Sequence, residues 1–360
     1  MKNNVLCVAP WTNIHVSTTG GVAPCCFGKD LDNVNNPDFE YAKHPKLIEI
    51  KKELLAGTTP SYCSDCPEFT WYDEFRGTTI HNDTDFELKS VDVRWSNQCN
   101  LSCVYCTANE SSTWDQLKNN TTTTTTRKYK SQHGKLLSLI KENNVHRVSL
   151  LGGEPLLIKE NIALLDTIDD NASVTVFTNL TIDINKSKVY QLLLERNNVE
   201  WIVSMETVGE RFEFVRRGGE WQTLVNNLTH LTSNLNTTST VNSMSQFSVY
   251  SATNMIELYE FSKQFGDKFV IHWGTKSQLS DEAAQLPYTF KQKIQKDIDY
   301  IKSNFQVNED FDLVVDAVND VRQDFGMIPS YVSKHHLQEA VYFNNRFNFL
   351  DLWPQYRIEE

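Results

Sequence analysis

The stretch Cys99-Asn100-Leu101-Ser102-Cys103-Val104-Tyr105-Cys106 decides how the rest of the chain is interpreted. Its cysteines follow the spacing C-x3-C-x2-C, so one tight loop can bring three thiolates to one face of a four-iron cluster and leave the fourth iron open. A structural zinc ion is the alternative, but zinc normally takes four protein ligands in a closed tetrahedron. The motif therefore favours an iron–sulfur cluster with one iron available for chemistry.

A second group of cysteines precedes this motif, at Cys7, Cys25, Cys26, Cys63 and Cys66, so that all eight cysteines lie before residue 107. The start of the chain lacks the long apolar segment of a secretory signal, and no run is long enough to span a membrane. We therefore expect a cytoplasmic protein without a membrane association. Because thiols stay reduced in that compartment, clustered cysteines indicate metal sites rather than disulfides.

The composition is that of a soluble globular protein, with 22% charged and 40% hydrophobic residues among 360. The formal net charge of −12 argues against a general nucleic-acid binder, because phosphate contacts need clustered Lys and Arg.

The pattern of apolar residues changes near residue 89. Residues 1–88 read as a small irregular unit, poor in core residues, with one expected helix at 45–55. Beyond it, apolar strands alternate with helices, which favours a parallel sheet in a partial barrel or a doubly wound fold. The expected strands lie near 91–95, 147–151, 173–177, 201–205, 240–250 and 268–273. The expected helices lie near 129–143, 159–168, 186–196, 221–235 and 254–265, with two more in a tail at 311–322 and 334–343.

Reactive loops of such folds lie at the carboxyl ends of the strands. Cys99 to Cys106 follow the first expected strand, and Gly152-Gly153-Glu154 follows the second. The cysteine spacing, with Tyr105 before the third cysteine, resembles the radical S-adenosylmethionine superfamily, and Gly152-Gly153-Glu154 resembles its GGE element. The resemblance implies an α/β fold, a partial (β/α)6 TIM-like barrel, with S-adenosylmethionine bound to the open iron of a [4Fe–4S] cluster on Cys99, Cys103 and Cys106.

Further cofactor-binding residues follow from the same resemblance. The two glycines would let the backbone approach the methionine moiety, and the Glu154 carboxylate would accept from its ammonium group. Candidates at later strand ends are Asn179, Ser204, Glu206 and Arg216, together with Tyr105 in the cysteine loop. Asn179 and Ser204 are equally well explained as turn or cap residues. Arg216 and Arg217 are adjacent, and the sequence leaves open which of them faces the site.

The earlier cysteines resemble the SPASM/twitch pattern of auxiliary clusters. Cys7, Cys25, Cys63 and Cys66 would hold a second [4Fe–4S] cluster, with Gly20 at the family's spacing before Cys25. A structural zinc on the same four thiolates stays open, as does Cys26 as the ligand if Gly21 takes the glycine's role. In relatives this segment usually follows the barrel, whereas here it precedes the cysteine motif. The implied organisation is an auxiliary domain at 1–88, a core at 89–305 and a helical C-terminal extension at 306–360.

The resemblance also implies an activity. A reduced cluster would cleave S-adenosylmethionine to a 5′-deoxyadenosyl radical, which abstracts a hydrogen atom from a substrate, with electrons from a flavodoxin- or ferredoxin-type donor. Relatives with such auxiliary clusters often modify peptides or proteins oxidatively, so a peptide is the expected substrate. The alternatives are a radical dehydrogenase or epimerase of a small polar molecule, and a non-catalytic iron–sulfur or zinc scaffold.

Overall fold

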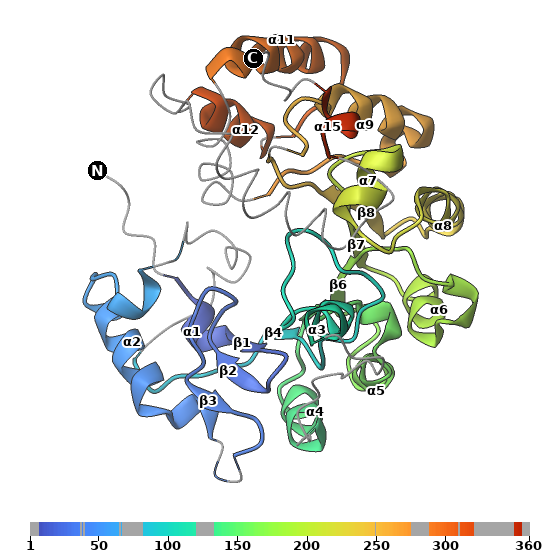
Figure 1. Ribbon diagram of the computed structural model, residues 1–360. Helices are drawn as coiled ribbons and strands as arrows, with labels where there is room; N and C mark the ends of the chain where they lie inside the picture. Colours follow the sequence, from blue (N-terminus) through green and yellow to red (C-terminus); the bar gives the residue numbers. More distant parts are fainter. Residues whose placement is uncertain are drawn as a thin grey trace.

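One sheet of eight strands organises the part of the chain that the structure, a computed structural model, describes (Figure 1). The described residues are 7–36, 38, 40–64, 66, 82–119, 133–248, 250–274, 288–308, 310–319 and 349–354. The strands are β1 (Asn13–Val16), β2 (Gly21–Ala23), β3 (Asp32–Asn33), β4 (Ser90–Val93), β5 (Arg147–Leu150), β6 (Ser173–Thr178), β7 (Val199–Ser204) and β8 (Thr240–Met244). Their spatial order is β3-β2-β1-β4-β5-β6-β7-β8.

The strands β4 to β8 are all parallel, which confirms the expected α/β fold of partial-barrel type. The sixth expected strand, near 268–273, is wrong as a continuous strand. That segment follows β8 in constant register but forms only two isolated parallel bridges, Asn242 to Val270 and Ser245 to Trp273. Its alternating buried residues, Phe269, Ile271 and Trp273, give it the sequence pattern of a strand.

The N-terminal segment is not irregular, contrary to the sequence-based expectation. β1 and β2 form an antiparallel hairpin, closed by a turn in which Gly20 has a φ of +81°. β1 also pairs in parallel with β4, so the hairpin extends the barrel sheet. The strands are only four and three residues long and include polar residues such as Asn13, which hid them from a search for apolar runs.

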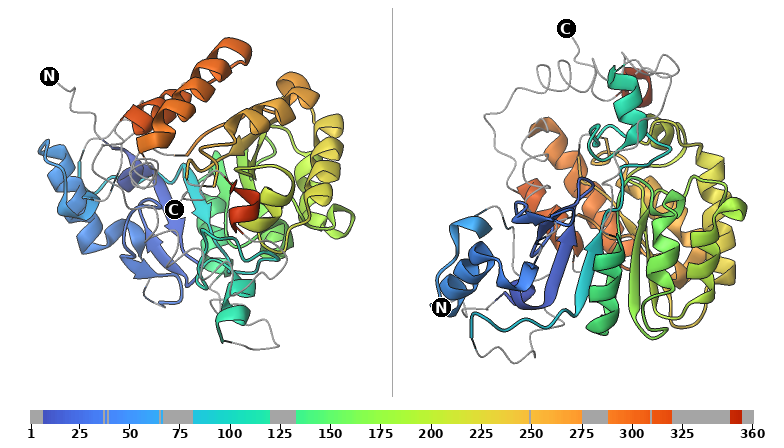
Figure 2. Two further views of the ribbon diagram at one scale, coloured as in Figure 1. Left: turned by 45° about the horizontal axis from the view of Figure 1, so that its top comes forward. Right: turned by 90° about the horizontal axis from the view of Figure 1, so that it is seen from below.

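Helices cover the outer side of the curved sheet. The α-helices are α1 (Ala9–Thr12), α2 (Pro45–Leu55), α3 (Ser112–Asn119), α4 (His133–Glu142), α5 (Glu160–Leu165), α6 (Lys188–Glu195), α7 (Gly209–Val215), α8 (Trp221–Asn234), α9 (Met255–Ser262), α11 (Tyr288–Asn304), α12 (Asp310–Asn319) and α15 (Phe349–Leu352). Short 3-10 helices are η1 (Tyr41–Lys43), η2 (Ser61–Cys63), η4 (Pro155–Leu157), η5 (Ile184–Lys186) and η6 (Lys263–Lys268). Both views of Figure 2 place α2 (blue) beside the N-terminal strands, on the opposite side of the molecule from α6 and α8 (green to yellow).

Six of the expected helices match α2, α5, α6, α8, α9 and α12 to within a few residues at their ends. The expected helix at 129–143 begins outside the described residues and continues as α4, and the one at 334–343 lies outside them altogether. The sequence did not predict α3, α7 or α11. None of the described helices has the length and apolar character that a membrane crossing requires.

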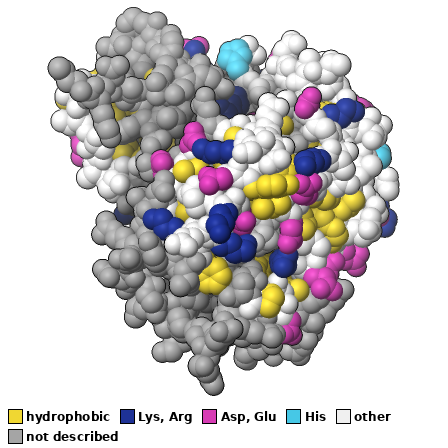
Figure 3. Space-filling model, turned by 90° about the horizontal axis from the view of Figure 1, so that it is seen from above, with side chains coloured by type: hydrophobic (Ala, Val, Ile, Leu, Met, Phe, Trp, Pro, Cys, Tyr) yellow, Lys and Arg dark blue, Asp and Glu magenta, His cyan; other side chains and the backbone are white. Residues whose placement is uncertain are grey.

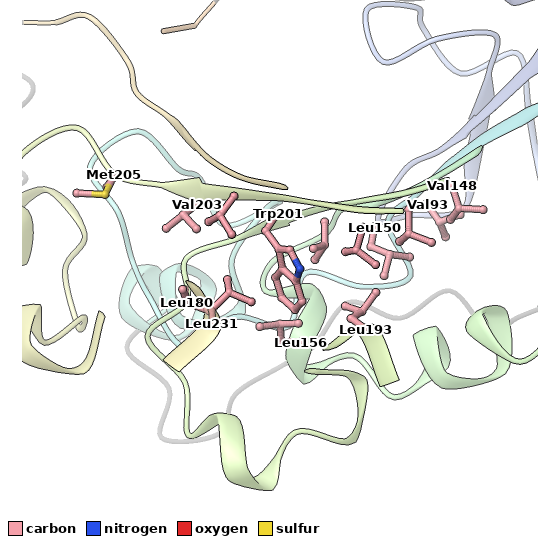
Figure 4. Close-up of a cluster of buried hydrophobic side chains, with 14 of the residues drawn as sticks. Val93, Val148, Leu150, Leu156, Leu180, Leu193, Trp201, Val203, Met205 and Leu231 are labelled. Atoms are coloured by element: carbon pink, nitrogen blue, oxygen red, sulfur yellow. The ribbon is translucent and has the colours of Figure 1, made fainter. Parts of the chain in front are cut away.

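The two faces of the sheet differ because apolar and polar residues alternate along the strands. The outer face carries Val148, Leu150 and Trp201, all fully buried. Figure 4 shows these side chains pointing toward Leu156 and Leu193 from the crossover segments. Each such side chain contributes roughly 1.5–3 kcal/mol through burial, so this layer holds the strands in place.

The inner face carries a polar row instead. Strand pairing aligns His15 with Asp92, Asp92 with Ser149, Ser149 with Thr175, and Thr175 with Glu200. A parallel sheet buried by apolar packing on both faces would show continuous hydrophobic runs. The alternation therefore identifies the inner face as one built to meet polar groups.

Candidate active site

The three cysteines of the motif lie in a loop directly beyond β4. The Cys106 thiol donates a hydrogen bond to Cys103 Sγ, which, together with the Arg216 cation, lowers the pKa of Cys103 to about 7 although burial opposes this. Burial raises the pKa of Cys99 to about 12, and the nearby Cys103 adds to this effect. The backbone N–H of Leu101 donates to Cys99 Sγ at 3.4 Å. The loop thus gathers three sulfurs in a setting with N–H donors, as iron–sulfur ligands require.

Backbone pairing with the segment after α7 fixes the shape of this loop. Ser102 N donates to Arg217 O, and Val104 N donates to Val215 O, each at 2.9 Å. Gly218, with a φ of +93°, lets this segment approach Asn100 closely, because a Cβ there would lie 3.2 Å from Asn100 O.

The glycines of the GGE element pack against the cysteine loop. A Cβ on Gly153 would lie 2.3 Å from Gln98 O, and Gly152 has a φ of +132°. Gly153 N donates to Ser96 O at 3.2 Å, and Glu154 N donates to Gln98 O at 2.7 Å. The two glycines therefore let the end of β5 hold the loop, a role that the sequence analysis did not assign to them.

Glu154 ties the ends of two strands together. Its carboxylate is fully buried and accepts from Leu156 N at 3.1 Å, Thr178 Oγ1 at 2.8 Å and Asn179 N at 2.8 Å. Burial raises its pKa to about 7, and these three donors limit the rise. A carboxylate offers about four acceptor positions, so most of its capacity is used within the protein.

Asn179 also contacts the cysteine loop. Its Nδ2 donates to Asn100 Oδ1 at 2.9 Å and lies 3.9 Å from Cys99 Sγ, while its Oδ1 accepts from Thr181 N at 2.8 Å. Ser204, at the end of β7, is half-buried and its hydroxyl forms no hydrogen bond with the described residues.

The structure separates the roles of the two adjacent arginines. Arg216 pairs with the fully buried Glu206, through Nε to Oε2 at 2.9 Å and through Nη2 to Oε1, and its Nη1 lies 3.8 Å from Cys103 Sγ. Arg217 lies over the Trp114 ring instead, 5.4 Å from its centre. Arg216 is therefore the arginine that faces the cysteines, and Glu206 positions it.

Tyr105 connects the loop to the C-terminal segment. Its hydroxyl is 2.9 Å from Ser248 Oγ, and its ring meets Tyr250 edge-on at 5.9 Å. Tyr250 in turn contacts Trp353, whose Nε1 donates to Tyr250 O at 3.1 Å. Trp353 is fully buried and also packs on Phe214, so the segment around α15 supports the loop from behind.

The polar residues that begin α3 also hold the cysteine loop, and the sequence motifs did not indicate them. Cys99 N donates to Ser112 Oγ at 3.1 Å, and Thr113 Oγ1 donates to Cys99 O at 2.7 Å. Ser111 Oγ donates to Leu101 O at 2.5 Å, and Trp114 Nε1 donates to Cys103 O at 2.7 Å. A run of hydroxyl residues before a helical stretch is a helix-start signal that could have indicated this segment.

The N-terminal cysteines form the second group that the sequence predicted. Burial raises the pKa of Cys7 to about 12, and Cys25, Cys63 and Cys66 add to the rise, so all four thiols are neighbours. Cys66 N donates to Cys63 O at 3.1 Å, which gives this pair a tight turn. Cys26 is exposed, and the charged groups with the largest effect on its thiol are Asp92, Cys25 and Arg94.

Both groups suit iron–sulfur clusters. Each is a set of thiols carried on loops, and backbone N–H groups donate toward Cys99 and toward Cys25, from Phe27 and Gly28. Within the described ranges, no three His, Cys, Asp or Glu side chains converge closely enough to hold one metal ion. A four-iron cubane is wider than an ion and takes its ligands further apart.

Two family profiles match the segments that contain the two cysteine groups. Residues 93–245 match the profile of the radical SAM superfamily, and residues 7–67 match SPASM, an iron–sulfur cluster-binding domain. The chain thus carries a radical SAM domain and a SPASM domain, and it is an enzyme of the radical SAM class. More particularly, it is a radical SAM protein whose SPASM domain precedes the barrel, with a [4Fe–4S] cluster, S-adenosylmethionine and an auxiliary cluster as its cofactors.

Solved structures with a similar fold include Streptococcus suis SuiB bound to its precursor peptide SuiA, with 15% identity over 82% of this chain and 70% of that chain, at a TM-score of 0.44. SuiB bound to S-adenosylmethionine has 17% identity over 73% and 60%, with a TM-score of 0.42. Polyhistidine-tagged anSMEcpe with bound AdoMet has 16% identity over 61% and 60%, with a TM-score of 0.40. No curated protein sequence matches the chain.

Proposed function

We propose that this radical SAM enzyme oxidatively modifies a peptide or protein, and that Cys99, Cys103 and Cys106 bind the cluster at which the reaction begins. When bound, the reduced cluster and S-adenosylmethionine supply a 5′-deoxyadenosyl radical that abstracts a hydrogen atom from the substrate. The observation that carries the proposal is the position of the cysteine loop, which the ends of β5 and β6 hold at the carboxyl edge of the sheet.

The protein's own residues divide into two sets in this proposal. Glu154, Asn179 and the Arg216–Glu206 pair hold the loop, because their polar groups already have protein partners. The Ser204 hydroxyl and the Gly153 carbonyl accept no hydrogen bond from the described residues, and we assign them to the ribose and the ammonium group of the cofactor.

Arg216 has an electrostatic role in this arrangement. Three cluster thiolates carry negative charge, and a buried guanidinium 3.8 Å from Cys103 Sγ stabilises it.

Cys7, Cys25, Cys63 and Cys66 are assigned to the auxiliary cluster, and a flavodoxin- or ferredoxin-type protein is assigned as the electron donor. An acceptor cluster beside the inner face suits an oxidation, in which the substrate gives up an electron after losing a hydrogen atom. A dehydrogenase or epimerase of a small polar molecule is the second candidate.

Replacing Cys99, Cys103 or Cys106 by Ala tests the proposal. Each variant should lose 5′-deoxyadenosine production in anaerobically reconstituted protein with dithionite, measured by chromatography with mass detection. Ser138→Ala on the exposed side of α4 is the control and should retain it. Continued cleavage in any of the three cysteine variants would contradict the assignment. Deuterium transfer from labelled peptides or small polar molecules into 5′-deoxyadenosine then separates the two substrate classes.

A further inference from the structure

The polar row on the inner face differs at its two ends, because the side chains at one end hydrogen-bond to one another and a buried side chain at the other, called the open end, has no partner. At the β7 end, Glu200 accepts from Thr175 Oγ1 at 3.0 Å and from Asn242 Nδ2 at 3.5 Å. At the β1 end, His15 is 6% exposed and its Nδ1 has no hydrogen-bond partner among the described residues. Asp92 Oδ2 lies 4.0 Å from this nitrogen, which is too far for a hydrogen bond. The open end therefore lies between β1 and β4.

Arg94 lies on the same face, directly above this open end. Its backbone N–H donates to Val16 O at 3.0 Å, so the strand pairing continues one residue past β4 and keeps the alternation of faces. The side chain is half-buried, and its guanidinium forms no ion pair or hydrogen bond with any residue that the structure describes. An arginine on an inward face normally has a partner, because burial of an unpaired cation is unfavourable.

Most surface cations have a different environment. Figure 3 shows Lys and Arg side chains interspersed with Asp and Glu over the described part of one face. Several form local pairs, such as Lys293 Nζ with Asp297 Oδ2 at 3.0 Å. Arg94 has the Asp92 carboxylate two residues before it on the same face but forms no ion pair with it or with any other described residue, so we look for a partner outside the described residues.

The neighbours of Arg94 place it between the two cysteine groups. It lies five residues before Cys99, at the edge of the sheet where the cysteine loop begins. Its charge also acts on the thiol of Cys26, next to Cys25, and counteracts part of the rise that burial causes in the pKa of that thiol. A group held by Arg94 would therefore lie near Cys26 and near the start of the cysteine loop.

The imidazole of His15 is neutral at pH 7. Burial lowers its pKa to about 4, Asp92 opposes the change and Arg94 adds to it. The open end therefore carries the Arg94 cation and the Asp92 carboxylate, which accepts from Asn13 Nδ2 at 3.4 Å, beside a neutral imidazole that can donate one hydrogen bond.

We propose that Arg94, supported by His15, anchors a carboxylate of the substrate on the inner face between the two cluster sites. The planar guanidinium matches a carboxylate through two parallel hydrogen bonds. A single cation fits a single negative charge, and the net charge of −12 disfavours a polyanion. This inference rests on the proposed function, since it names a chemical feature of the substrate of that reaction.

Three small probes test the anchor on anaerobically reconstituted protein by saturation-transfer NMR titration. N-acetylglutamate α-methylamide presents a side-chain carboxylate, N-acetylglutamine a terminal carboxylate, and N-acetylglutamine methylamide neither. A carboxylate probe should bind about tenfold or more tightly than the neutral one, as expected for a charge-assisted hydrogen bond. The tighter carboxylate probe identifies the source of the anion.

Substitutions test whether the preference for a carboxylate depends on Arg94. Arg94→Gln should remove the preference for the carboxylate, and Arg94→Lys should keep part of it. Lys141→Gln makes the same charge change on the exposed side of α4 and should keep the full preference. A wild-type protein that binds all three probes equally, or an Arg94→Gln variant that keeps the preference, overturns the proposal.

The proposed function is judged separately, by 5′-deoxyadenosine production in the wild-type protein. Cleavage without a carboxylate preference rejects the anchor alone. A carboxylate preference without cleavage rejects the proposed function.

Discussion

Cys25 and Cys26 are adjacent in sequence but differ in their surroundings. The sequence could not choose between them, because either spacing from a glycine fits the auxiliary pattern. The hairpin favours Gly20 over Gly21 as the glycine of that pattern, since Gly20 has the positive φ in the turn between β1 and β2. The largest electrostatic effects on the two thiols differ as well, because Cys66 and Asp92 act on Cys25, whereas Asp92, Cys25 and Arg94 act on Cys26.

We therefore expect Cys25→Ala to lose about half of the iron of the reconstituted protein, since one of two four-iron clusters loses a ligand. Cys26→Ala, its matched neighbour, should keep the full iron content. Iron and sulfide analysis with electron paramagnetic resonance checks both variants. The reverse pattern would assign the ligand to Cys26.

Several residues of the site were predictable because their chemistry is local. Cys99, Cys103 and Cys106 are marked by spacing alone. The partners of Arg216 and the three donors of Glu154 were not predictable, because they come from residues that only the folded chain brings together. A sequence that lists polar residues at strand ends does not say which of them bind one another and which remain available for a ligand.

At the scale of elements, the contact between the end of β5 and the cysteine loop leaves no room for a side chain. Gly153→Ala should destabilise the protein by about 1–3 kcal/mol through overpacking, since its Cβ would meet the backbone at Gln98. It should also lower the iron bound at the cysteine loop. Urea unfolding of the cluster-free protein and iron analysis after reconstitution measure the two effects.

Gly134→Ala in α4 is the control for that change. Its Cβ would meet nothing within 4 Å, so the substitution should be neutral or stabilise by up to about 1 kcal/mol. Equal effects of the two substitutions would show that the contact with the loop does not matter.

Strands with strong apolar alternation, such as β5 and β6, were predicted to within a residue or two. β1 and β2 were not, because such short strands are stabilised by their neighbours, β4 for β1 and β1 for β2, rather than by their own pattern. For the segment after η6 the error was the opposite one, because a strand was predicted where alternating residues are buried without forming a continuous strand.

At the scale of the whole molecule, the expected boundary between residues 88 and 89 stays a prediction, and the pairing of β1 with β4 argues for one cooperative unit. A chain that starts at Lys89 would expose β4 as an edge strand, paired only with β5, and would remove the buried Ile14 and Val16. We expect this truncated chain to aggregate, as judged by soluble yield and size-exclusion chromatography.

The full-length Cys63→Ala/Cys66→Ala variant is the control, because it loses auxiliary thiols but keeps β1. It should remain soluble and monodisperse to the same extent as the unmodified chain. A soluble, folded truncated chain would show that the two segments are independent domains.

The shared sheet has a consequence for electron tunnelling, whose rate falls steeply with separation. Cys25 follows β2 and Cys99 follows β4, so hydrogen-bonded register rather than a hinge sets the separation of the two clusters that we assign to these cysteines. That gap should stay constant while substrates come and go. The rate of electron transfer between the two assigned clusters would then depend on the strand pairing of the sheet.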